Sequence, residues 1–337
     1  MSGVGLVWPT HDSVAPTVND IAQDPLVSTL TWPDEVDAII GGDLTAGLAY
    51  VTPAGGTVLS AVAPIGIRDR EAGTVGFTTS LGFGRKLDRI TRDPKVALAY
   101  HTREHGFATP PGVVVVQGTA TVVPSTAELR DELTVRAERF LGPLKRGRFW
   151  DRWLRAYYDD RVLVTVRAER ILSWPDEVAT GEPAIVGPPL PAAPPQSPPK
   201  KGTAARVDVG KAARKLTPSH RLLGWRGGDG YPVVVPLRAI GGFGDYLWLR
   251  AGGEILPPGE RRIGVLAHDY QPELIGLRSA HALGWLETTE RGEGRFYPHT
   301  MGGFVAPPNK TLLLLANGFL ARRGLRQAAK AGRTVPT

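Results

Sequence analysis

The sequence predicts a mainly β fold with helices (α+β), built as two small β-barrels in tandem. Short apolar, β-branched segments recur along the chain and are separated by glycine and proline turns, a pattern typical of antiparallel strands. A segment with eight prolines, residues 181–203, divides the chain. Because proline removes hydrogen-bond donors and favours extended chain, we expect a linker there between two domains.

Each half is read separately. In residues 1–180 we expect five or six antiparallel strands and two or three short helices. Pro53-Ala54-Gly55-Gly56 suits a hairpin turn, and Asp93-Pro94 ends the basic helix because the residue before proline avoids the α region. A lone sheet of this size would leave its edges unprotected, which favours a barrel. The expected strands are residues 44–52, 57–67, 73–79, 96–101, 113–123 and 161–173, and the helices begin near 85 or cover 126–140 and 148–158.

The second half, residues 204–337, repeats this order in degraded form. A hairpin is expected over residues 222–225 and 231–237, followed by a strand over 245–250. Residues 259–263 take the place of 84–88, and 282–286 that of 116–120, which supports a tandem repeat. The end of the chain, from residue 311, reads as a strand followed by a basic helix.

Composition restricts the function. The 337 residues include no cysteine, so thiolate metal sites, disulfides and cysteine nucleophiles are excluded. Forty Lys and Arg against thirty-three Asp and Glu give a net charge of +7 without a long basic run, which argues against nucleic acid and favours small anionic ligands. The first residues lack a signal-peptide pattern and no stretch is long enough to span a membrane, so we expect a cytoplasmic protein without an integral membrane segment.

Residues 76–100, GFTTSLGFGRKLDRITRDPKVALAY, are the most informative segment. They predict a strand, a glycine-containing loop and the start of a basic helix, where cations gain nothing from the helix dipole. A bound anion would explain them; the alternative is a solvated helix face formed by Arg85, Arg89 and Arg92. The loop of the second half, LPPGERR over residues 256–262, has two prolines, which lack the N–H that an anion needs. We therefore expect a working phosphate site in the first barrel only.

Four segments of the first half together resemble the split β-barrel flavoproteins of the pyridoxamine 5′-phosphate oxidase superfamily, including its F420-dependent branch. They are VAPIG at 62–66, the strand-loop-helix at 77–100, VVVVQGTATVV at 113–123 and VRAERILSW at 166–174. The resemblance implies two tandem split β-barrels and a cofactor, FMN or F420, in a groove between barrels. This sequence departs from the simplest members of that superfamily, because one chain holds two unequal barrels. They would form either an internal pseudo-dimer, which we favour, or a homodimer through the first halves.

Carried over residue by residue, the resemblance places the cofactor phosphate at the end of one strand and the ring along another. An arginine fork and an ammonium match phosphate geometry, and strand backbone groups can hydrogen-bond a flat ring. The implied function is an FMN- or F420-dependent oxidoreductase acting on a small organic substrate; the alternative is a non-catalytic cofactor- or haem-binding protein. The implied phosphate residues are Thr78, Thr79, Ser80, Arg85 and Lys86, and the ring residues are Ser60, Val62, Ala63 and Pro64.

The remaining motifs say less about function. His101 and His105 are four residues apart, but a strand end followed by a loop makes metal or haem ligation a minor alternative, and we expect no metal site. His268, His281 and His299 are scattered, and no Ser-His-Asp order is present. The aromatic face of residues 149–158 (Phe149, Trp150, Trp153, Tyr157, Tyr158) predicts packing, with a substrate pocket as the alternative. Trp-Pro-Asp-Glu-Val, at 32–36 and 174–178, reads as the start of a helix or turn.

Overall fold

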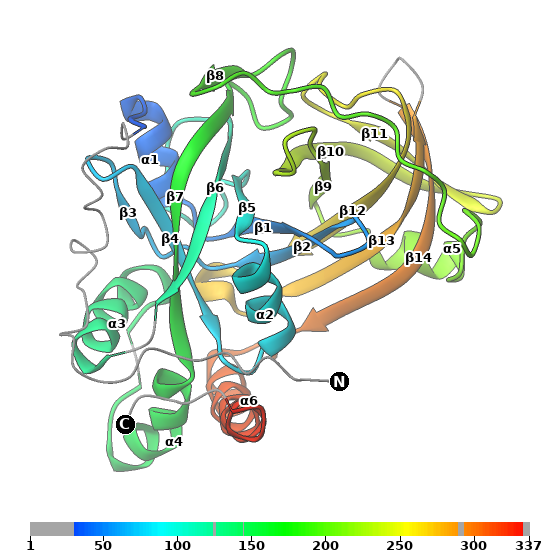
Figure 1. The fold of residues 1–337 in the computed structure, drawn as a ribbon. Helices are drawn as coiled ribbons and strands as arrows, with labels where there is room; N and C mark the ends of the chain where they lie inside the picture. Colours follow the sequence, from blue (N-terminus) through cyan, green and yellow to red (C-terminus); the bar gives the residue numbers. More distant parts are fainter. Residues whose placement is uncertain (1–29, 124–125, 144, 289–292, 333–337) are drawn as a thin grey trace.

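The computed structural model describes residues 30–123, 126–143, 145–288 and 293–332. Most elements are strands, arranged in one eight-stranded sheet and one closed six-stranded barrel (Figure 1). The predicted fold class, mainly β with helices in two β units, is therefore confirmed. Residues 1–29, in which the sequence predicts no signal peptide, lie outside the described part.

The first unit follows the predicted order closely. Its sheet has the order β2-β1-β5-β6-β7-β4-β3 with β8 paired to β7, and an isolated bridge between Ala63 and Thr78 joins the chain after β2 to β4. Its elements are α1 (Asp34–Gly42), β1 (Ala46–Val51), β2 (Thr57–Val62), β3 (Arg68–Asp69), β4 (Thr74–Ser80), α2 (Gly84–Arg92), β5 (Lys95–Tyr100), β6 (Val113–Val123), α3 (Ala127–Leu141), α4 (Arg148–Asp159), β7 (Arg161–Trp174) and β8 (Ala184–Val186).

The second unit is the closed barrel β10-β11-β14-β13-β12-β9. In chain order, the six strands β9 to β14 correspond to β1, β2, β4, β5, β6 and β7 of the first unit. With this correspondence the two units have the same strand order. The elements are α5 (Val209–Lys215), β9 (His220–Arg226), β10 (Pro232–Phe243), β11 (Tyr246–Ala251), β12 (Gly259–Asp269), a 3-10 turn (Pro272–Leu274), β13 (Arg278–Thr288), β14 (Glu293–Val305) and α6 (Lys310–Lys330).

Two sequence-based expectations in this unit are wrong. Residues 259–263 do not match the helix start at 84–88: they begin β12, which pairs with β13 and β9, so the chain passes from β11 to β12 without a helix. The C-terminal segment contains no strand before its helix. Asn309 caps α6 by accepting a hydrogen bond from Leu312 N at 2.9 Å, and the leucine run is the first turns of that helix.

The two units share a tightly packed seam. Ala49, Ala97 and Val115 of the first unit are buried in the same apolar cluster as Leu223 and Val265 of the second. Glycine makes the approach possible: a Cβ atom on Gly264 would lie 2.1 Å from the carbonyl oxygen of Thr57, so β12 contacts β2 at backbone distance.

The proline-rich segment lies against both units. Gln196 donates to the carbonyl oxygen of Gly55 and accepts from the backbone N–H of Arg262. Arg261 is buried and donates to the carbonyl oxygens of Ala193 and Pro258. The boundaries of the domains and linker, 1–180, 181–203 and 204–337, stay a prediction. None of the helices in the described part of the chain is long and apolar enough to cross a membrane.

Of the predicted aromatic face of α4, Trp153 packs against α6, which confirms a packing role for this residue, whereas Phe149 is largely exposed. Trp153 Nε1 donates to the carbonyl oxygen of Leu315 at 3.3 Å, and Arg322 stacks over its ring. Of the two Trp-Pro-Asp-Glu-Val copies, the first starts α1 at Asp34. The second forms a turn after β7, in which Asp176 accepts hydrogen bonds from two backbone N–H groups.

Candidate functional site

The loop between β4 and α2 brings several predicted phosphate residues together. Thr79 is buried near the end of β4, and Lys86 Nζ donates to its Oγ1 at 3.4 Å. No side chain caps the start of α2 and no acidic residue occupies its first turn. Phe83 N and Lys86 N donate to the carbonyl oxygens of Ser80 and Phe83, and the positive end of the helix dipole is not offset by a carboxylate of its own first turn.

A second cation, which the sequence analysis missed, lies beside Lys86. Arg161 begins β7 and is paired in register with Ser80 of β4. Its Nε is buried without a hydrogen-bond partner in the described residues, and its guanidinium also covers the ring of Tyr157. Burial, with the nearby Arg161 charge, lowers the pKa of Lys86 to about 8. Two cations held close at a buried position favour an anionic ligand.

Asp160 limits the charge of this cluster. Its Oδ1 accepts from the backbone N–H of Gly82 at 3.3 Å, and Ser80 Oγ accepts from the same N–H at 2.9 Å. Burial raises the pKa of Asp160 to about 6, opposed by the Ser80 hydrogen bond and the Arg161 charge. The chain therefore supplies a carboxylate of its own to the loop, and a phosphate would compete with it electrostatically.

The predicted ring residues lie on the neighbouring strand. Thr78 N donates to Ala63 O at 3.3 Å, which ties the end of β2 to β4. Ser60 Oγ is buried without a hydrogen-bond partner among the described residues. Ile65, two residues after Ala63, has φ of 44°, a conformation that is costly for a β-branched residue and often found near functional sites.

Three of the predicted residues differ from the rest in their exposure. Arg85 is exposed on α2, and no hydrogen bond or ion pair described for the chain joins it to Thr79 or Lys86. Val62 and Pro64 are buried, so little of their surface is accessible to a bound ring. The structure thus joins Thr79, Ser80 and Lys86 with Arg161 and Asp160 and ties Ala63 to Thr78. No described contact joins Ser60 to this cluster, and Arg85 lies at the surface.

Three histidines, His101, His220 and His268, form a cluster at the seam between the units. His101 Nδ1 lies 3.1 Å from the carbonyl oxygen of Ala99, so this nitrogen must carry the proton, and His101 Nε2 must accept from His268 Nε2 at 3.0 Å. Burial lowers the pKa of both rings, which keeps them neutral. Within the described residues no group of three or more His, Asp or Glu side chains could hold a metal ion. His105 lies edge-on to Tyr270 instead.

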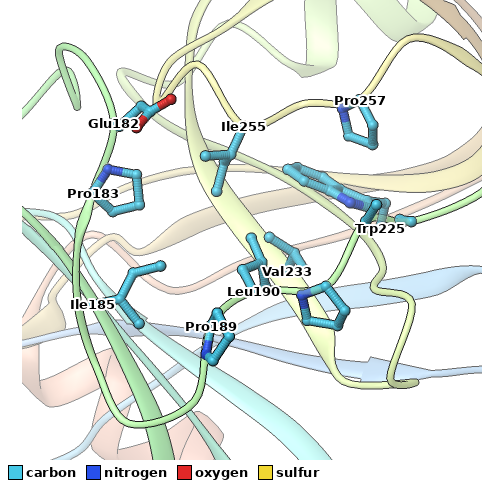
Figure 2. A pocket seen from close by; sticks show the side chains of 12 residues that line it. Glu182, Pro183, Ile185, Pro189, Leu190, Trp225, Val233, Ile255 and Pro257 are labelled. Carbon is cyan, nitrogen blue, oxygen red and sulfur yellow. The ribbon is translucent and has the colours of Figure 1, made fainter.

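A separate pocket of about 340 Å³ lies beside the second barrel (Figure 2). Trp225 and Val233 form its floor, Ile255 and Pro257 come from the β11–β12 loop, and the proline-rich segment closes another side with Leu190. None of the predicted cofactor residues lines it. Its loop carries prolines where the first unit has glycines, and its walls are mostly apolar, so it lacks the donors that a phosphate requires.

No family model matches the chain, and no curated protein matches it. Several solved structures are similar to part of it. A conserved hypothetical protein from Mycobacterium tuberculosis is 22% identical, with 45% of this chain and 89% of that one covered and a TM-score of 0.33. An F420 reductase is 22% identical over 42% and 98% of the two chains, with a TM-score of 0.32. A pyridoxamine 5′-phosphate oxidase-related, FMN-binding protein from Nostoc punctiforme is 12% identical over 58% and 87%, with a TM-score of 0.27. At these scores none of them assigns an activity to this chain.

Proposed function

We propose that this chain binds FMN or F420 at the Lys86–Arg161 cluster and is an oxidoreductase that transfers hydride to or from a small organic substrate. The observation that carries the proposal is the pair of partly buried cations. Lys86 Nζ contacts the Thr79 hydroxyl and the ring of Phe83 but forms no ion pair in the described residues, and Arg161 has an unpartnered Nε. Burying such groups without a counter-charge is costly. A phosphate would offset that cost with charge-assisted hydrogen bonds.

The residues present fit such a cofactor at both ends. Lys86, Arg161, Thr79 and the free start of α2 would hold the phosphate, and Ser60 Oγ offers a buried hydroxyl for a polar ring atom. The bound cofactor would supply the hydride chemistry. The protein would position it and exclude water, which agrees with the lack of an acid–base motif in the sequence.

The competing class is a non-catalytic cofactor- or haem-binding protein. A haem needs an axial ligand, and the ring nitrogens of His101 are already occupied by Ala99 O and His268. His101 is therefore not free to serve as that ligand. A cytoplasmic location agrees with the cysteine-free sequence and stays a prediction.

The test is a spectrum of the purified chain followed by titration with FMN and with F420. Replacing Arg161 by Met should weaken binding of either cofactor by about 1.5–3 kcal/mol, roughly 10- to 150-fold, because a charge-assisted contact is lost. Arg85→Met is the matched control, since Arg85 is exposed, and should leave affinity within about 3-fold. Binding of neither cofactor, or equal losses in both variants, would refute the site. Binding without turnover of any reductant or substrate pair would favour the non-catalytic class.

A further inference from the structure

The C-terminal helix α6 covers the β4–α2 loop at backbone distance. Gly82 of the loop and Gly324 of α6 face each other: a Cβ on Gly82 would lie 2.8 Å from the Cα of Gly324, and a Cβ on Gly324 would lie 3.2 Å from Asp160 Oδ1. In Figure 1, α6 lies beside α4 at the end of α2 nearest the loop. No space for even a methyl group is left between the loop and the helix at this point.

The helix also reaches the apolar core to which α2 contributes. Ala328 is fully buried in the same apolar cluster as Leu87 and Ile90 of α2, and Leu325 packs against that cluster. α6 therefore covers the loop before α2 and shares a buried core with the helix that carries Lys86.

Several contacts hold α6 along its length. Lys310 forms an ion pair with Glu273 at 2.8 Å near its start. Gly318 accommodates the indole of Trp153, and Arg322 donates to the carbonyl oxygens of Arg152 and Trp153. The helix is thus an integrated part of the site wall, because both its ends and its middle are packed.

This wall bears on which cofactor fits. A phosphomonoester such as FMN ends at its phosphate. In F420, a phosphodiester, and in FAD, a pyrophosphate, the chain continues beyond that phosphorus. A group continuing past the Gly82 end of the loop would have to pass the backbone of α6. Resting on the proposed function, we infer that the site selects a terminal phosphomonoester and that α6 enforces this selection, so that FMN binds in preference to F420 or FAD.

The experiment compares ligands that differ only at the phosphate. The full chain is titrated, by flavin or deazaflavin fluorescence, with FMN, the monomethyl phosphate ester of FMN, FAD and F420. FMN should bind most tightly, the methyl ester at least 10-fold more weakly, and FAD and F420 at least 100-fold more weakly. Equal affinity for FMN and its methyl ester, or F420 binding within 10-fold of FMN, would overturn the inference while leaving the proposed function intact. Binding of none of the four ligands would refute the proposed function itself, and the inference with it.

A second arm tests α6 directly. Trp153→Ala removes the packing surface under Gly318, and Arg322→Ala removes the hydrogen bonds to Arg152 and Trp153 without opening a cavity. Neither residue contacts the Lys86–Arg161 cluster in the described contacts. In a variant that thermal unfolding shows to be folded, the ratio of FMN to methyl-ester affinity should fall to less than 3-fold, while FMN affinity stays within about 3-fold. An unchanged ratio in both variants would mean that charge, and not the helix, sets the preference, and would overturn the role of α6.

Discussion

Replacing Lys86 by Met should raise the stability of the ligand-free protein and lower its affinity for a phosphate ligand. Burial, with the Arg161 charge, lowers the pKa of Lys86 from 10.5 to about 8. At about 1.4 kcal/mol per pKa unit, the buried ammonium costs the folded state about 3 kcal/mol at pH 7, where it is charged in both states. Met has a similar length and no charge, so the variant should gain up to that amount.

The pH dependence follows from the same values. Between pH 8 and 10.5 the unfolded chain binds more protons at this lysine than the folded chain does, so the stability of the wild type rises with pH across that window. The variant should lack this rise. The difference in the free energy of unfolding between the two proteins should therefore shrink from about 3 kcal/mol at pH 7 towards zero above pH 10.5.

Urea unfolding at several pH values, followed by tryptophan fluorescence, measures this difference. Arg92→Met is the matched control: it removes an exposed cation from the last turn of the same helix and should cost about 0.3–1 kcal/mol. A Lys86→Met variant that is less stable than the wild type at pH 7 would show that the ammonium is satisfied within the fold. The anion site would then lose its energetic basis.

Two further changes test buried carboxylates. Asp160→Asn should stabilise the ligand-free protein at pH 7 by at most about 3 kcal/mol, because burial raises the pKa of Asp160 to about 6. The stability linked to the protonated form of Asp160 is lost as pH rises from about 4 through 6. If the variant and the wild type differ in free energy of unfolding by the same amount at pH 4 and at pH 7, this prediction is contradicted. Arg103→Met should lower the free energy of unfolding by about 3–5 kcal/mol at pH 7 and above, because it leaves the buried carboxylate of Asp43 without its partner. Burial raises the pKa of Asp43 to about 7. Adding Asp43→Asn should recover most of the loss in urea unfolding, and no recovery would mean that Arg103 acts through its other hydrogen bonds.

Local signals predicted the strands and helices of the first unit well. Glycine turns between β-branched runs define hairpins within a few residues, and Asp93-Pro94 ends α2 where expected. The errors fall where local signals are ambiguous. A short leucine run reads equally well as a strand or as a buried helix, and only the Asn309 cap decides for α6.

The site was predictable only in its local part. Thr79 and Lys86 are joined by one loop, so a strand-loop-helix pattern suffices to bring them together. Arg161 and Asp160 reach the loop because of the register in which β4 pairs with β7. A slip of one residue in that register would turn the side chains of the strand to the other face of the sheet, and the sequence alone does not determine the register. The contact of Gly324 with Gly82 depends on the path of the chain after β14 and could not be read from residue types.

The shared strand order of the two units explains why both loops are covered. β7 and β14 hold the same place in their units, as do β4 and β11. The continuation of β14, helix α6, covers the loop after β4, and the continuation of β7, the proline-rich segment, lines the pocket beside the loop after β11. Each loop is therefore completed by a segment of chain that continues from the other unit, so neither half forms the whole site alone.

The two loops differ in the chemistry of their residues. The first loop has glycines and two adjacent cations. The second has Pro257 and Pro258, and its Arg261 donates to the carbonyl oxygens of Ala193 in the covering segment and of Pro258 in the loop itself. That difference favours one anion site in each chain, on the first unit, with the second unit contributing the helix that closes it.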